Sequence, residues 1–159
     1  RKKHGEDRKM QFRVRVEVPV KPTEKEEVIL KLIESIITST DVRIEGEEMG
    51  RVALATSPCL SSLTKLHSML RRERILDSAR KYLLSGIHGD TLTFLMHKQA
   101  LAAGRISFVS NENESPLGPV IVTVVHPRIH EVVDWLAPPT REGKPIKNID
   151  VPQPDCSSE

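Results

Sequence analysis

Near its start the chain alternates apolar and charged residues from Phe12 to Val18. Because successive side chains of a strand point to opposite faces, this alternation predicts a strand with one buried and one solvent-facing side. A helix-start signal follows it. Thr23 can cap a helix, and Glu26 three residues later completes a capping box. This part of the chain is therefore expected to form a strand followed by a helix that runs to about Ser39.

Along the chain, apolar residues recur either at every second position, as in a strand, or every three to four positions, as in a helix. The resulting order of elements is β-α-β-β-α-α-β-α-β-β-α, and residues 105–109 are among the expected strands. The links around Gly46 and Pro116 have the length of hairpin turns, which join antiparallel strands. The pattern predicts an α+β fold with a mostly antiparallel sheet and helices packed on one face. Residues 10–139 are expected to form this single domain, with a flexible extension at 1–9 and an extended polar tail at 140–159.

Composition excludes some classes of protein. Aromatic residues make up only 3% of the chain, so the core is expected to consist of Leu, Ile and Val. No apolar run reaches the roughly 20 residues that cross a bilayer, and no signal-peptide pattern precedes the first strand. Cys59 and Cys156 form no CxxC pair and are expected to be reduced thiols. These features predict a cytoplasmic protein with no membrane partner.

Several motifs between residues 11 and 145 occur together and in a fixed order. They are Val14-Arg15-Val16-Glu17, Pro19-Val20, Pro22-Thr23-Glu24, Arg74-Ile75-Leu76-Asp77, Ala79-Arg80, His97-Lys98-Gln99-Ala100, Ser115-Pro116-Leu117-Gly118-Pro119 and Asp134-Trp135-Leu136-Ala137-Pro138. In these motifs the chain resembles a small archaeal family of uncharacterised proteins described as predicted RNA-binding proteins or predicted exosome subunits. The resemblance implies RNA as a partner and a fold similar to the ribosomal protein that binds five-S RNA. His97 stands where the family has asparagine and Pro139 where it has a basic residue, so any ligand contact of that basic residue is missing here.

Arginines recur at the solvent-facing positions of the expected strands. If the apolar residues face the helices, the other face of the sheet carries Arg13, Arg15, Arg43, Arg51 and Arg105. The planar fork of arginine can bond two phosphate oxygens, so this face is expected to hold an RNA backbone. The alternative is that these arginines pair across strands with Glu17 or Glu45.

Other cations stand on the expected helices. Arg71 and Arg72 are candidates for binding RNA, whereas Arg80 falls near the apolar side of its helix and is expected to meet a carboxylate. Lys98 and Gln99 begin a short helix and could grip a phosphate or a base edge. The alternative for that pair is a solvated turn.

Motifs of known catalytic chemistry are missing from the sequence. It contains no GxSxG, Walker loop, GxGxxG or HExxH. His126 and His130 are four residues apart, but the sequence places no third metal ligand near them. We therefore expect no cofactor, no metal and no enzymatic activity. The sequence predicts a non-catalytic RNA-binding module accessory to RNA processing or degradation, within an RNA-processing complex. The alternative is a protein-interaction or homodimerisation module.

Overall fold

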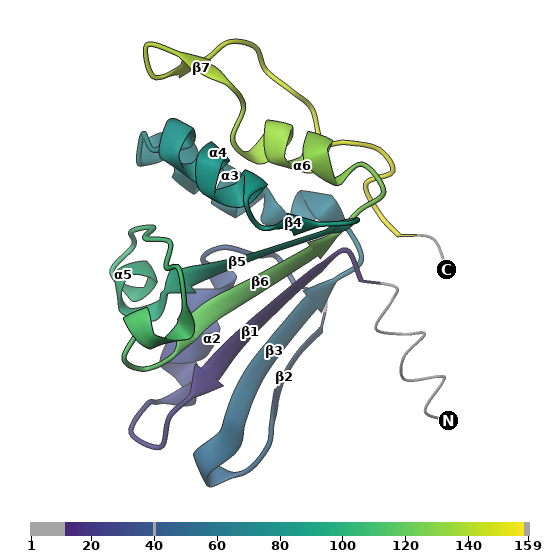
Figure 1. Ribbon diagram of the computed structural model, residues 1–159. Helices are drawn as coiled ribbons and strands as arrows, with labels where there is room; N and C mark the ends of the chain where they lie inside the picture. The colour runs from purple at the N-terminus through teal and green to yellow at the C-terminus, as the bar shows by residue number, and fades with distance from the viewer. Residues whose placement is uncertain (1–11, 40, 158–159) are drawn as a thin grey trace.

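The computed structural model describes residues 12–39 and 41–157 (Figure 1). Its centre is a six-stranded antiparallel sheet with the strand order β2-β3-β1-β6-β5-β4. These strands are β1 (Val14–Val20), β2 (Asp41–Glu45), β3 (Arg51–Ser57), β4 (Ile87–His88), β5 (Thr91–His97) and β6 (Pro119–Val125). The predicted α+β class is confirmed. The extension expected at residues 1–9 lies outside the described residues.

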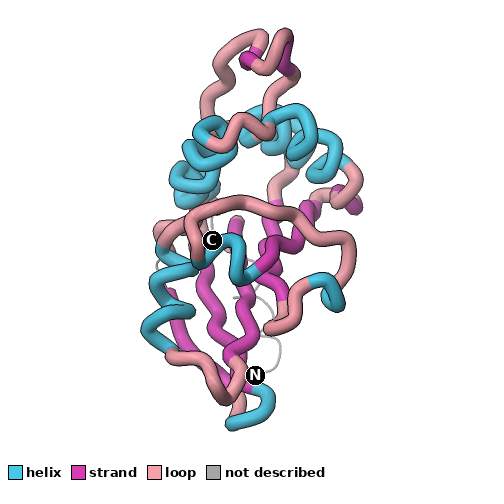
Figure 2. Tube along the Cα trace, turned by 90° about the vertical axis from the view of Figure 1, so that its left-hand side faces the viewer, coloured by secondary structure: helices cyan, strands magenta, loops and turns pink. Residues whose placement is uncertain are grey.

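Helices cover one face of this sheet (Figures 1 and 2). They are α2 (Glu26–Glu34), α3 (Thr64–Arg72), α4 (Leu76–Leu84), α5 (Lys98–Ala102) and α6 (Ile129–Leu136), with short 3-10 turns η1 (Glu48–Gly50), η2 (Leu60–Leu63) and η3 (Glu112–Glu114). Figure 1 shows α2 behind the sheet and α3, α4 and α6 gathered above it. None of the helices in residues 12–39 and 41–157 has the length and apolarity that a bilayer span requires.

Strand β1 lies at the centre of the sheet, between β3 and β6. Val14, Val16 and Val18 are fully buried against the helices, while Arg15 and Glu17 point to the opposite face. The alternation in the sequence therefore assigned the faces of this strand correctly. Aliphatic side chains dominate the buried core, as the low aromatic content predicted.

The start and end of α2 differ from the expectation. The helix begins at Glu26 with Lys25 as its N-cap residue, no side chain caps it, and it ends at Glu34. Glu26, the expected partner of Thr23 in the capping box, forms an ion pair with Arg51 instead. Ile36 and Ile37 are nevertheless buried, because the chain that follows the helix continues across the core.

Residues 105–109 were expected to form a strand, and this prediction was wrong. Phe108 makes one isolated bridge to Met96, and the segment otherwise runs as a loop along the edge of β5. The Tyr82 hydroxyl accepts the Leu95 N–H at 3.1 Å, and so occupies a position that a neighbouring strand would need. Arg105 is therefore a loop residue.

After α6 the chain forms a small hairpin and then returns to the body. Strands β7 (Thr140–Arg141) and β8 (Lys144–Pro145) form the hairpin, which stands away from the sheet in Figure 1. Farther on, Ile149 and Val151 pack against the core and Pro152 is buried. Composition gave no sign of this docking, because the segment is polar and rich in proline.

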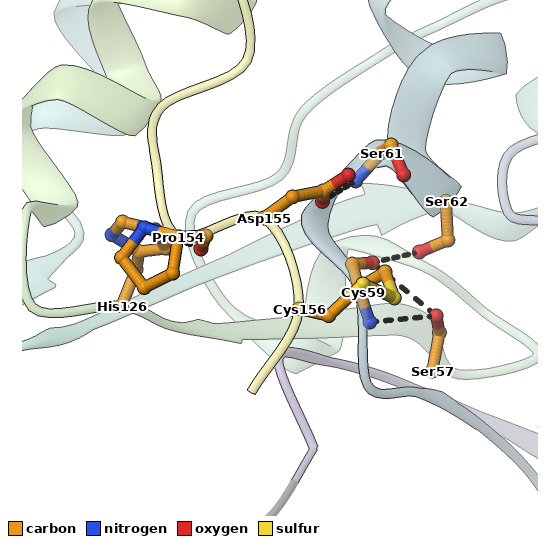
Figure 3. Close-up of a disulfide and its surroundings, with 8 residues drawn as sticks. All are labelled: Ser57, Cys59, Ser61, Ser62, His126, Pro154, Asp155 and Cys156. Atoms are coloured by element: carbon orange, nitrogen blue, oxygen red, sulfur yellow. Dashed lines mark hydrogen bonds between the residues drawn. A yellow bond between two sulfur atoms is a disulfide. The ribbon is translucent and has the colours of Figure 1, made fainter. Parts of the chain in front are cut away.

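A disulfide between Cys59 and Cys156 fixes the returning segment (Figure 3). The expectation of two reduced thiols was therefore wrong. The two residues are 97 positions apart, and only the folded chain brings them together. The Leu60 N–H donates to the Asp155 carbonyl at 2.9 Å, and the Ser61 N–H donates to the Asp155 carboxylate at 2.7 Å.

Candidate nucleic-acid interface

The face of the sheet that points away from the helices carries fewer arginines than expected. By strand register, Arg43 of β2, Leu54 of β3, Glu17 of β1 and Ile121 of β6 form one row across it. We call the outward residues of these four strands the outer face. Arg15 and Arg43 lie on it, as the sequence predicted.

Both of these arginines have carboxylate partners on their own strands. An Arg15 guanidinium nitrogen lies 3.7 Å from Glu17, and the Arg43 Nε lies 3.0 Å from Glu45. With Asp41 on the same side of β2, the outer face holds two arginines and three carboxylates. It therefore offers no net positive charge to a polyanion.

Arg51 lies on the opposite face, so its predicted place was wrong. It is the register partner of the buried Val20 and forms an ion pair with Glu26 of α2. The buried residues of β3 are Ala53, Ala55 and Ser57, whereas Val52 and Leu54 point outward. The sequence assignment was off by one residue, which turns every side chain of a strand to the other face.

Arg13 also leaves the predicted set, because it precedes β1 at a bend in the chain. Burial lowers the pKa of its guanidinium, and the nearby carboxylate of Asp155 opposes that shift. Burial likewise lowers the pKa of His126, the Pro154 carbonyl opposes this, and Arg13 adds to the lowering. Arg13 therefore lies beside the returning C-terminal segment.

Lys98 is a buried structural residue, so its predicted role in binding RNA was wrong. Its side chain is only 2% exposed. The Nζ atom donates to the carbonyls of Pro19 at 2.6 Å and Leu117 at 2.5 Å, and to Glu24 at 2.9 Å. The ammonium has three N–H groups and three acceptors, so none remains for a ligand.

The neighbours of Lys98 on either side behave differently. Gln99 is exposed at the start of α5. The His97 Nδ1 accepts the Ala100 N–H at 3.2 Å and so caps this helix. Asparagine is a favoured N-cap residue, so histidine can replace the family's asparagine here without loss of the cap.

Arg71, a predicted RNA-binding residue, is partly buried and joins the ends of two helices. Its guanidinium donates to the carbonyls of His67, Trp135 and Leu136, at 3.0 to 3.2 Å. Burial lowers its pKa. Arg80 makes a similar link, because it donates to Asp134 at 2.8 Å, as expected for an arginine on an apolar helix side.

Two predicted RNA-binding cations, Arg72 and Arg105, line two adjoining surface hollows. The first, of about 420 Å³, is lined by Ser35, Thr64, Lys65, Ser68, Met69, Arg72 and Gly104. The second, of about 330 Å³, is lined by Glu73, His97, Ala100, Arg105, Ile106 and Ser107. Because Arg72 and Gly104 of the first directly precede Glu73 and Arg105 of the second, the two hollows adjoin. We call them together the α3–α5 groove.

The arginines of the α3–α5 groove are open to solvent. Arg72 and Arg105 are both exposed, and within the described chain neither guanidinium has a hydrogen-bond or ion-pair partner. The Lys65 Nζ donates to the Glu34 carbonyl at 2.8 Å, which leaves its charge uncompensated. Lys65 was not among the predicted RNA-binding residues. Its signal was the spacing of seven residues to Arg72, which places both on one side of a helix.

This geometry defines the protein as an antiparallel α+β domain with solvent-exposed cations in a surface groove. A family model described as RNA binding matches residues 13–127. The chain is 42% identical over 149 residues to a UPF0201 protein of Aeropyrum pernix, which covers 93% of this chain and 99% of the relative. It is 46% identical over 141 residues to a UPF0201 protein of Metallosphaera sedula, covering 89% and 98%.

A solved structure agrees with these relatives. The 2.2 Å crystal structure of a UPF0201 protein from Methanococcus jannaschii superposes with a TM-score of 0.74 at 26% identity, covering 84% of this chain and 98% of that one. The chain therefore belongs to the UPF0201 family of these relatives, and it matches the family model described as RNA binding. Membership of an uncharacterised archaeal family is thus confirmed, whereas the exosome-subunit description and the likeness to the five-S-RNA-binding ribosomal protein stay predictions.

Proposed function

We propose that this protein is a non-catalytic RNA-binding module that holds RNA phosphates in the α3–α5 groove. The supporting observation is the exposure of Arg72 and Arg105 on adjoining hollows, with no bonded carboxylate among residues 12–39 and 41–157. The RNA-binding description of the family supports RNA as the polyanion.

Phosphate is the group that these side chains fit best. A guanidinium can donate two parallel hydrogen bonds to phosphate oxygens, and Lys65 adds a point charge beside Arg72. Among the described residues that line the groove there is no Phe, Tyr or Trp on which an unpaired base could stack. Binding therefore depends on the phosphate backbone and its shape, which favours helical over unstructured RNA.

The role of such a module is to hold RNA for another protein. We propose that it acts in the cytoplasm as an accessory to RNA processing or degradation, and that a processing enzyme supplies the chemistry. The exposed cations of the groove could hold RNA, and the sequence contains none of the catalytic motifs considered above.

A second candidate function is association through the outer face. Val52, Leu54 and Ile121 point outward there and are only partly covered by their neighbours. The in-strand pairs of Arg15 with Glu17 and of Arg43 with Glu45 balance its charge. Such a face suits a protein partner or a second copy better than a polyanion. Light scattering of wild type and Ile121→Asp would test it, since a mass that stays monomeric in both excludes a homodimer.

A salt series tests the proposed function. We would measure the affinity of the protein for a duplex RNA and for a single strand of the same length between low and physiological salt. The proposal predicts tighter binding to the duplex than to the single strand. A plot of the logarithm of the binding constant against the logarithm of the salt concentration should have a slope of about −0.9 for each phosphate contacted. Photocrosslinks should map to peptides that contain Arg72 or Arg105. Absence of binding at low salt would overturn the proposal.

A further inference from the structure

The hairpin of β7 and β8 brings two positive charges face to face. Arg141 and Lys144 are direct partners in its antiparallel register. Side chains opposite each other in such a pair lie close together, and like charges there destabilise the hairpin. In the part of the chain that the structure describes, neither side chain has a hydrogen-bond or ion-pair partner. The hairpin thus carries an uncompensated electrostatic cost.

The turn of this hairpin adds a second cost. Glu142 has φ of 53° and Gly143 has φ of 82°, so both central residues adopt the left-handed conformation of a tight two-residue turn. Glycine adopts this conformation freely, but a residue with a side chain does so less readily. The turn nevertheless fixes the backbones of Arg141 and Lys144 opposite each other on adjacent strands.

We propose that this hairpin is a second phosphate-binding element, in which Arg141 and Lys144 hold one backbone phosphate of RNA between them. The inference rests on the proposed function for the identity of the ligand. A phosphate between the two cations removes their repulsion, and the preset turn means that little order is lost on binding. Lys147, exposed just beyond β8, adds positive charge next to the same hairpin.

One contact fixes the hairpin to the body, and another closes the hairpin at its base. The Thr140 hydroxyl donates to the carboxylate of Asp77 at the start of α4, and the Ile146 N–H donates to the Pro139 carbonyl at 2.9 Å. The chain that leads into α4 contains Glu73, which lines the α3–α5 groove. Figure 1 shows the hairpin and α5 on the same side of the molecule, and Figure 2 looks onto that side. An extended RNA can therefore reach both elements.

The test compares two double variants that remove the same charge. Arg141→Gln with Lys144→Gln alters the hairpin, and Lys25→Gln with Lys31→Gln alters two exposed lysines near α2 as the control. Each is titrated with a long duplex RNA and with a short oligonucleotide that cannot span both elements. We expect the hairpin variant to bind the long duplex about tenfold more weakly and to lower its salt slope by about one. Its binding to the short oligonucleotide should not change.

Thermal unfolding of the same variants separates a ligand site from a structural role. Removing the like-charge pair should leave the melting temperature unchanged or raise it, while RNA binding weakens. If the wild type binds RNA and the hairpin variant matches the control on the long duplex, the hairpin inference is wrong and the proposed function stands. If the wild type binds neither RNA, both are wrong. If inorganic phosphate binding depends on the hairpin but RNA binding does not, the site serves a free anion and the inference fails.

Discussion

The Nζ atom of Lys98 lies 2.9 Å from the carboxylate of Glu24, inside the protein. Both residues belong to motifs that mark the family in the sequence, yet their contact is structural. Burial lowers the pKa of the lysine, and the hydrogen bond and charge of Glu24 oppose that shift. The pair joins the segment before α2 to the start of α5.

Replacing Lys98 by Met should therefore destabilise the fold. The change leaves a largely buried carboxylate and two carbonyls without their donor, and losing one partner of a buried pair costs about 3 kcal/mol or more. Urea unfolding would measure it. Gln99→Met is the matched control, because Gln99 is exposed, and it should change stability by less than about 0.5 kcal/mol. Equal losses in both variants would contradict the assignment.

Reduction of the Cys59–Cys156 disulfide should lower stability. A cross-link that closes a loop of about 100 residues restricts the unfolded chain by up to about 4.7 kcal/mol. We expect wild type to unfold at lower urea concentration with dithiothreitol than without it. The variant with both cysteines changed to Ser should match reduced wild type and ignore the reductant. Unchanged unfolding of wild type on reduction would show that the tether adds no stability.

Acidification should destabilise the protein through His67. Burial, with a smaller effect from Arg71, lowers the pKa of this histidine to about 4, and its ring lies 4.9 Å from that of Trp135. The unfolded chain, with a pKa near 6.5, takes up the proton first, so stability falls as pH drops from about 6.5 to about 4. Because His67 is half-buried, we expect only part of the full linkage. His67→Phe should make the unfolding free energy fall less steeply between pH 7 and 5, with a slope left over from His126, whose pKa burial also lowers. An unaltered pH dependence would contradict this.

A side chain at Gly118 should not fit. The residue has φ of 89°, and a Cβ atom there would lie 2.3 Å from the Pro19 Cγ. Gly118→Ala should cost about 2 kcal/mol, from the strained backbone and the clash together. Gly50→Ala is the control, because its Cβ would meet no atom within 4 Å and its backbone is not left-handed. Chemical denaturation of both variants measures the difference, and similar values would contradict the account.

Periodicity predicted those parts of the fold where one face of an element is apolar and the other polar. In α6 the apolar residues Ile129, Val132, Val133 and Leu136 recur at helical spacing, and all four are buried. In β3 both faces are apolar, so the pattern could not choose between Val52 and Ala53. In the structure the alanines Ala53 and Ala55 face the helices. Arg51 alternates in step with them, so it lies on the helix side of the sheet and not on the outer face.

The candidate site was predicted only in part for the same reason. Arg72 and Arg105 were identified as cations, but their meeting in one groove depends on how α3 packs near the turn after α5. The burial of Lys98 depends on three acceptors that come from different parts of the chain. No local pattern records such contacts between distant segments.

The most direct test of the central claim compares two surfaces at one salt concentration. Arg72→Gln with Arg105→Gln removes two charges from the α3–α5 groove, and Arg15→Gln with Arg43→Gln removes two from the outer face. We predict that the groove variant binds duplex RNA about tenfold more weakly than wild type and that the outer-face variant binds like wild type. A loss confined to the outer-face variant, or no loss in the groove variant, would contradict the account.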